Sequence, residues 1–275
     1  MLYQFTKMQG TGNDFVIFNT FSHPLSLSCE QIKHIADRRL GIGCDQVLLL
    51  EPPKNNETDV YYRIFNSDGT EVTQCGNGAR CIGIYLNNKG LVKKNSIIAE
   101  TKSSQLILKI NNNSVTVNMG IPEFEPADIP LNISGRLENY SLSLGDEEII
   151  FGAVSIGNPH AVIIVDDVES ASVESIGAAI QEYGVFPKGV NVGFVQILDR
   201  KTIKLRVYER GAGETLACGS GACAAAVISC QQGYLGDVVE VKLRGGCLKI
   251  HWAGEGEPVY MNGSVSTVYE GEIEL

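Results

Sequence analysis

The chain contains the same short phrase twice, and each copy runs directly into an apolar stretch of helical length. The copies, Cys75-Gly76-Asn77-Gly78-Ala79 and Cys218-Gly219-Ser220-Gly221-Ala222, lie 143 positions apart. At that offset the preceding residues also match: Arg63-Ile64-Phe65-Asn66 with Arg206-Val207-Tyr208-Glu209, and Glu71 with Glu214. A gap-free match of this kind indicates an internal duplication. We therefore expect two similar halves, each with one cysteine at the start of a helix.

The size and charge of the chain restrict its class. With 275 residues, 44% of them hydrophobic, it can form two domains with a core each. The first twenty residues do not resemble a signal peptide, so we expect a cytoplasmic protein whose eight cysteines are reduced. No apolar run approaches the roughly 20 residues that span a bilayer. A formal charge of −10 disfavours nucleic acid and anionic membranes, which leaves a small-molecule partner.

Local patterns predict an α+β fold in which strands outnumber helices. Capping signals and terminal glycines predict helices over residues 28–40, 77–88, 171–183 and 220–232. Alternating or β-branched runs predict strands over 105–110, 114–119, 161–165, 202–208 and 238–250. A proline-bearing connector at 120–122 marks a boundary. We expect an N-terminal half of residues 1–119 with 264–275, and a C-terminal half of residues 120–263.

The repeated phrase has a chemical meaning. A free thiol has a pKa near 8.5, and a helix N-terminus lowers it because unpaired N–H groups and the partial positive charge favour an anion. The glycines after each thiol let backbone N–H groups turn inward, which forms a cradle for a carboxylate. Two such loops around an amino-acid-like molecule would place sulfur on either side of its Cα.

Three plainer interpretations compete with catalysis. One Cys-Gly-x-Gly phrase is more often a tight turn with a buried cysteine, although a packing turn has no reason to keep cysteine in both copies. Zinc binding is disfavoured because Cys75 and Cys81, like Cys218 and Cys223, lack the usual ligand spacing. A disulfide between Cys75 and Cys218 stays possible as a side reaction, without a C-x-x-C motif to support it.

Four stretches together resemble the diaminopimelate epimerase family: Lys7 to Phe15, Asn66 to Cys81, Gly157 to His160, and Tyr208 to Cys223. The resemblance implies two pseudo-symmetric domains, each a mostly antiparallel barrel-like sheet around a central helix, with the active site in the interdomain cleft. It also implies interconversion of LL- and meso-diaminopimelate, with no metal and no cofactor, in bacterial lysine and peptidoglycan precursor synthesis.

The same resemblance assigns roles by position. It implies that Cys75 and Cys218 are the acid/base pair and that His160 and Glu209 assist them. It further implies a set of substrate-binding residues, namely Asn13, Gln46, Asn66, Gly76, Asn77, Asn158, Asn191, Glu209, Arg210, Gly219 and Ser220. A substrate with a second amino-acid head needs such remote donors and acceptors, which orient Cα between the sulfurs.

These residues predict a two-base mechanism, in which one cysteine removes the α-proton as thiolate and the other donates a proton as thiol to the opposite face. Two alternatives stay open: another racemase of the same fold, similar to proline racemases, and a redox-sensing binding protein without catalysis. By position, Tyr269 resembles a family residue at a dimer contact, so we expect a homodimer.

Overall fold

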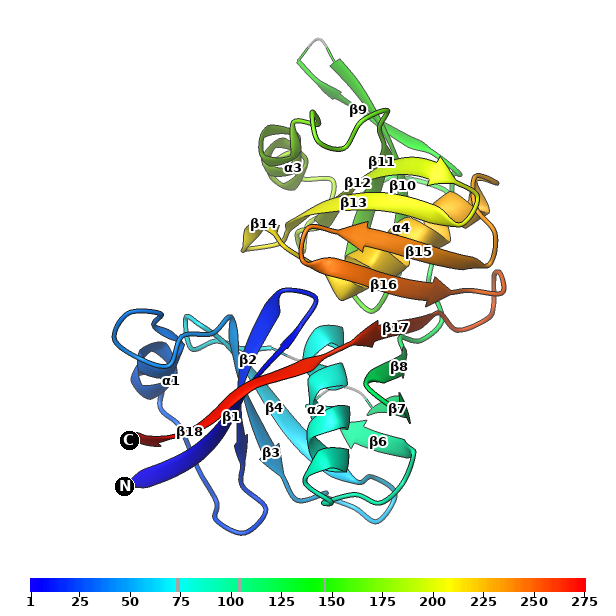
Figure 1. Ribbon diagram of the computed structural model, residues 1–275. Helices are drawn as coiled ribbons and strands as arrows, with labels where there is room; N and C mark the ends of the chain where they lie inside the picture. Colours follow the sequence, from blue (N-terminus) through cyan, green and yellow to red (C-terminus); the bar gives the residue numbers. More distant parts are fainter. Residues whose placement is uncertain (73–74, 103–104, 146) are drawn as a thin grey trace. The chain divides into compact units, whose positions relative to one another are not determined.

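The computed structural model describes residues 1–72, 75–102, 105–145 and 147–275 (Figure 1). The chain divides into two compact units. Unit 1 comprises Met1–Val117 and Gly263–Leu275, and unit 2 comprises Asn118–Asn262. The C-terminal segment belongs to unit 1 because β18 (Ser266–Glu274) pairs antiparallel with β1 (Leu2–Gly10). Within the described ranges, every helix is too short or too polar to cross a membrane.

Unit 1 is a mostly antiparallel sheet with two helices. Its parallel neighbours are β2 with β3 and β4 with β6, and its other pairs are antiparallel. After β1, its elements are β2 (Asn13–Asn19), α1 (Cys29–Ala36), β3 (Gln46–Glu51), β4 (Val60–Asn66), β5 (Glu71–Val72), α2 (Gly76–Asn88), β6 (Ser96–Glu100), β7 (Gln105–Asn111) and β8 (Ser114–Asn118).

Unit 2 repeats this order. Its parallel neighbours are β11 with β12 and β13 with β15, which correspond to the parallel pairs of unit 1. An extra hairpin strand, β9, pairs with β10. The elements are β9 (Tyr140–Leu144), β10 (Glu147–Ser155), β11 (Pro159–Ile164), α3 (Val173–Glu182), β12 (Asn191–Asp199), β13 (Thr202–Glu209), β14 (Gly213–Thr215), α4 (Gly219–Gln231), β15 (Val238–Leu243), β16 (Gly246–His251) and β17 (Tyr260–Ser264).

The duplication predicted from the repeated phrase is confirmed by a pair of matching ion pairs. In unit 1 the Arg63 guanidinium donates to both carboxylate oxygens of Glu71, at 2.8 and 3.1 Å. In unit 2 Arg206 donates to both oxygens of Glu214, at 2.6 and 2.7 Å. Each of these bidentate ion pairs, or forks, joins the two strands of the short hairpin that precedes the cysteine, so the same type of contact holds both hairpins.

One helix in each unit is buried along most of its length. Nearly every residue of α2 from Gly76 to Leu86 is buried, and so is nearly every residue of α4 from Gly219 to Ser229. In α4 small and apolar residues occupy all faces, as expected for a helix packed on every side. It contacts six strands of its own unit, β10 to β13, β15 and β16. The expected central helices are therefore present.

The structure differs from two local predictions. The first helix ends at Ala36 instead of continuing to residue 40, because Asp37 leaves the helical conformation and its carboxylate accepts the N–H groups of Arg39 and Leu40. The run 238–250 is an antiparallel hairpin, β15 with β16, instead of one strand. The predicted strands at 105–110, 114–119, 161–165 and 202–208 correspond to β7, β8, β11 and β13.

The more buried of the two forks gives a stability prediction. Replacing Glu214 by Gln should lower the free energy of unfolding by about 2 kcal/mol, because Arg206 is about 10% exposed and keeps its charge without its carboxylate. Urea titration followed by fluorescence suits this test, because the single tryptophan, Trp252, is buried in unit 2.

The matched controls are Glu71→Gln, in the more exposed fork, and Glu240→Gln, in an exposed pair 3.8 Å from Lys242. We expect a loss of about 1 kcal/mol or less at Glu71 and none measurable at Glu240. Equal losses at Glu214 and Glu240 would contradict the structural role of the fork.

Candidate active site

In unit 1 three amide side chains meet at one edge of the sheet. Asn13 and Gln46 begin the parallel strands β2 and β3, and Asn66 ends the antiparallel strand β4. Gln46 lies opposite Asn66, and its Nε2 donates to Asn66 Oδ1 at 2.9 Å. The strand directions alone therefore gather three of the predicted substrate-binding residues.

In two of these amides the side-chain oxygen accepts no hydrogen bond from any described residue. Among the described residues, Asn13 Oδ1 and Gln46 Oε1 are buried and have no hydrogen-bond partner. A buried polar atom without a partner costs stability, about 1–3 kcal/mol for a typical group. Two such acceptors at one sheet edge fit a ligand that brings N–H donors, such as an ammonium group.

Cys75 is the N-cap residue of α2. Its Sγ accepts the backbone N–H of Gly78 at 3.4 Å, so the sulfur already takes the acceptor role that suits a thiolate. Next to it, the buried Asn77 side chain is fixed by Arg80, whose Nη2 donates to Asn77 Oδ1 at 2.6 Å. The predicted residues Cys75, Gly76 and Asn77 thus form the first turn of the buried helix.

In unit 2 a continuous set of contacts leads to Cys218, the N-cap residue of α4. Its Sγ lies 3.7 Å from Ser220 Oγ, which accepts from Asn158 Nδ2 at 3.4 Å. With that amide nitrogen committed, Asn158 Oδ1 faces His160 Nε2 at 3.0 Å. His160 Nε2 must then carry the proton, which defines the tautomer of the neutral ring.

The surroundings of Cys218 favour the thiol. Burial raises the pKa of Cys218 well above its usual value, and the negative charge of Glu209 and a hydrogen bond to it raise the pKa further, against the smaller lowering effect of hydrogen bonds from the Gly221 N–H and Ser220. Glu209 is in turn held by the hydroxyl of Thr215, which donates to Oε1. Thr215 is not among the predicted site residues, although it lies in the matched stretch before Cys218.

The remaining predicted residues of unit 2 hold one another in place. The Asn191 side chain donates to the Pro159 carbonyl at 3.2 Å and accepts the backbone N–H of Arg210 at 3.0 Å. The exposed Arg210 guanidinium donates through Nη1 to the Lys188 carbonyl at 2.8 Å. A Cβ at Gly189 would lie 2.6 Å from Arg210 Cδ, so the stem of this arginine requires glycine there.

The structure thus gathers the predicted residues by unit. Asn13, Gln46 and Asn66 share one edge of the sheet in unit 1, and the equivalent Asn158 and Asn191 share one edge in unit 2. The strand registers agree, because Phe15 lies beside Gln46 and His160 lies beside Asn191. Among the residues that the structure covers, we find no group of three or more metal-ligating side chains.

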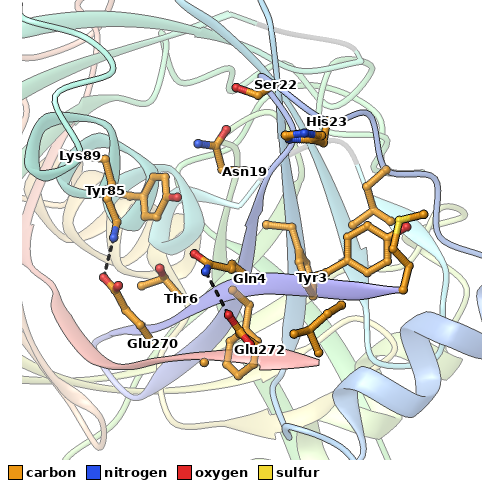
Figure 2. A pocket seen from close by; sticks show the side chains of 16 residues that line it. Tyr3, Gln4, Thr6, Asn19, Ser22, His23, Tyr85, Lys89, Glu270 and Glu272 are labelled. Carbon is orange, nitrogen blue, oxygen red and sulfur yellow. Dashed lines mark hydrogen bonds and ion pairs between the residues drawn. The ribbon is translucent and has the colours of Figure 1, made fainter. Parts of the chain in front are cut away.

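A separate cavity of about 800 Å³ lies in unit 1 between β1, β18 and α2 (Figure 2). None of the predicted substrate-binding residues lines it. Two polar contacts cross its wall, from Lys89 to Glu270 at 2.7 Å and from Gln4 to Glu272 at 3.1 Å. Tyr269, the predicted dimer contact, lies next to it on β18, packs edge-on against Phe5 and is 43% exposed.

This duplicated fold occurs in solved structures of other proteins. The chain is similar to a hydroxyproline epimerase from Agrobacterium vitis, with a TM-score of 0.72 and 15% identity over 100% of this chain and 93% of that one. It is also similar to a PhzF-family phenazine biosynthesis protein from Bacillus anthracis, with a TM-score of 0.70 and 17% identity over both chains in full. At these identities the similarity shows a shared fold only. This fold defines a class of α+β proteins with two duplicated halves.

Sequence comparisons identify the family of the chain within this class. The diaminopimelate epimerase family model matches residues 5–125 and 152–268. A diaminopimelate epimerase from Alkalilimnicola ehrlichii is 51% identical over 278 aligned positions, which cover both chains completely. The chain belongs to the diaminopimelate epimerase family, as the sequence motifs predicted.

The buried His160 gives a pH prediction. Burial, and next the positive charge of Arg210, lower the pKa of His160 to about 3, whereas an unfolded histidine titrates near 6.5. Between these two pKa values, this histidine is therefore protonated in the unfolded state and neutral in the folded state. The stabilising contribution is complete above about pH 6.5 and is lost as the pH falls toward 3.

Between pH 7.5 and pH 5.0 the wild type should lose about 2 kcal/mol more unfolding free energy than the His160→Gln variant. Urea titrations at both pH values measure this difference. His251→Gln, at an exposed histidine, should keep the slope of the wild type. Parallel slopes for the wild type and His160→Gln would show that His160 does not have a depressed pKa.

Proposed function

We propose that this chain interconverts LL- and meso-diaminopimelate, with Cys75 and Cys218 transferring protons on opposite faces of one α-carbon. The observation that carries the proposal is a cysteine at the N-cap of each of two equivalent buried helices, in a chain of the diaminopimelate epimerase family. The product would serve bacterial lysine and peptidoglycan precursor synthesis. The two thiols must stay reduced, which supports a cytoplasmic location.

The two environments favour different starting states. Cys218 is kept as a thiol by burial and by Glu209, so it is the proton donor of the resting enzyme. Each thiol accepts a backbone N–H, from Gly78 at Cys75 and from Gly221 at Cys218, so the difference between them is the burial of Cys218 and its contact with Glu209. Cys75 is then the thiolate that removes the α-proton. After one turnover the proton has moved from Cα to Cys75 and from Cys218 to Cα. The enzyme returns to its first state by the reverse reaction or by exchange with water, and the cycle requires no metal or cofactor.

The carbanion is the difficult intermediate, because an α-proton of an amino acid is far less acidic than a thiol. Its negative charge spreads into the adjacent carboxylate, where the N–H groups at the starts of α2 and α4 can stabilise it. Asn77 and Ser220 would complete these cradles. Asn13 Oδ1 and Gln46 Oε1 would accept from an ammonium group, and Arg210 would bind the second carboxylate.

The similarity to a hydroxyproline epimerase keeps a related racemase as an alternative at the level of the fold. The full-length 51% identity to a diaminopimelate epimerase favours diaminopimelate as substrate. Incubation with LL-diaminopimelate and, separately, with proline distinguishes these activities. Turnover of proline alone would reject our proposal.

Removing either thiol should stop epimerisation. Cys75→Ala and Cys218→Ala should each lower kcat by about a thousandfold or more, because each removes one proton-transfer group. Cys247→Ala, at an exposed cysteine of β16, is the control and should keep wild-type turnover. Near-normal turnover in either of the first two variants would exclude the two-base mechanism.

The same mechanism predicts a solvent isotope pattern. In D₂O, early meso product formed from LL substrate should carry deuterium at Cα, while the remaining substrate carries none. Mass spectrometry of both isomers at low conversion measures this. Retention of the original hydrogen in most of the product would point to a single base that works on both faces.

We further propose that the protein is a homodimer that associates through strands β1 and β18 of unit 1. These two strands expose Leu2, Val268 and Tyr269 by 62, 55 and 43%, and residues of the same strands line the cavity of Figure 2. Exposed apolar side chains beside an open cavity are typical of a protein contact. A second copy of the chain is the occupant that we propose.

Light scattering should give twice the chain mass for the wild type and a lower mass for Tyr269→Ala at the same concentration. Tyr183→Ala is the matched control, because Tyr183 is similarly exposed, at 49%, in unit 2. Its mass should equal that of the wild type. A monomeric wild type at working concentration would refute the dimer.

A further inference from the structure

Two carboxylates join the starts of β2 and β3 in unit 1, directly beside the predicted binding residues Asn13 and Gln46. Asp14 accepts the backbone N–H of Asp45 through Oδ1 at 2.8 Å. In return, Asp45 accepts the backbone N–H of Asp14 through Oδ2 at 3.0 Å. The Asp45 N–H also lies 3.1 Å from the Asp14 carbonyl oxygen, to which it donates. These reciprocal bonds hold together the two strand ends that carry Asn13 and Gln46.

A guanidinium lies between the two carboxylates. Arg38, in the turn after α1, donates from Nη1 to Asp14 Oδ2 at 3.0 Å. Its Nη2 donates to Asp14 Oδ1 and to Asp45 Oδ1, both at 2.8 Å. Because both oxygen atoms contact one nitrogen atom, the two negative charges are close to each other. Without the guanidinium these like charges would repel and push the two strand starts apart.

Lys7 anchors the buried side of this network. From β1, its buried ammonium contacts Asp14 Oδ2 at 2.8 Å and donates to the Gly43 carbonyl. Gly43 has a φ of 80°, and a Cβ there would lie 2.9 Å from the Cα of Arg38, so this turn requires glycine. Burial raises the pKa of Asp14, but hydrogen bonds from Arg38 and Lys7 outweigh burial and lower the pKa to about 2. Asp14 is therefore ionised near neutral pH.

Unit 2 holds the corresponding strand starts in a different way. In place of Asp14 and Asp45, the uncharged residues Pro159 and Val190 stand next to the matching amides. There the amide of Asn191 itself joins the strands, because its Nδ2 donates to the Pro159 carbonyl at 3.2 Å. A predicted binding residue thus serves as the link in unit 2. In unit 1 the carboxylates are the link, so the equivalent amide oxygens stay available to a ligand.

We propose that Asp14, Arg38 and Asp45 are positioning residues, which hold the starts of β2 and β3 so that the two amides there bind one substrate ammonium group together. The acceptors are Asn13 Oδ1 and Gln46 Oε1, both buried and without a hydrogen bond from the described residues. An ammonium has three N–H donors, so it can bond to both oxygen atoms at once. The inference rests on the proposed function, since the ammonium is that of diaminopimelate.

Steady-state kinetics of the full-length protein with LL-diaminopimelate tests the inference. In Arg38→Met the carboxylates repel each other, and the ammonium contact weakens equally in the ground state and the transition state. KM should therefore rise about tenfold, while kcat stays within about threefold of the wild type. In the double variant Arg38→Met/Asp45→Asn the repulsion is absent, and the new amide oxygen can still accept the Asp14 N–H. Its KM should return to within about threefold of the wild type.

Arg136→Met is the matched control, because Arg136 donates to both carboxylate oxygens of the exposed Glu255 in unit 2, at 2.6 and 2.7 Å. Both kinetic constants should equal those of the wild type. An unchanged KM in Arg38→Met would overturn the inference. A raised KM that the added Asp45→Asn does not restore would also overturn it, because repulsion between the carboxylates would then not be the cause.

If Arg38→Met does not fold, Asp45→Ala replaces it, at a side chain that is 46% exposed. This variant removes the acceptor of the Asp14 N–H, so KM should rise about threefold or more, and an unchanged KM overturns the inference. The wild type separates the two proposals. A wild type that does not turn over diaminopimelate rejects the proposed function and with it the inference, whereas turnover with an unchanged KM in the variant rejects the inference alone.

Discussion

The site depends on where a buried helix can begin. The first four N–H groups of a helix have no partner within it, so a helix buried on all sides must present that end to capping groups or to a ligand. In α2 the Cys75 sulfur accepts the Gly78 N–H and serves as the cap. The anion-binding cradle that we propose would thus follow from burying the helix in the sheet, and the fold buries an equivalent helix in both units.

Much of this architecture was predictable because its signals are local. Glycines after residues 88, 183 and 232 and the thiol phrases define the ends of three helices to within two residues. Strands were harder to predict. The run Val47–Leu50 in β3 is wholly buried and apolar, so it lacks the alternation that reveals a half-buried strand. The hairpin of β15 and β16 was hidden because its turn, at Arg244 and Gly245, interrupts the alternation too briefly.

The sequence motifs predicted which residues belong to the candidate site, but not how the contacts of these residues differ between the two units. Asn13 and Gln46 match Asn158 and Asn191 in the duplicated order, yet the first pair keeps buried acceptors open and the second pair is engaged by His160, Ser220 and Arg210. Those partners are set by strand pairing and by contacts 62 or 19 residues apart along the chain.

These differences bear on how a symmetric scaffold can serve a reversible reaction. Under the proposed mechanism the two resting forms of the enzyme differ only in which cysteine holds the proton, and each substrate isomer requires one of them. Glu209 can shift the balance between the forms but cannot alter the equilibrium between the isomers. Each 1.4 kcal/mol of bias makes one form tenfold rarer, which slows the direction that begins from it. The charges around two equivalent thiols must therefore differ enough to define a thiolate and a thiol, and little enough that either form can still start a turnover.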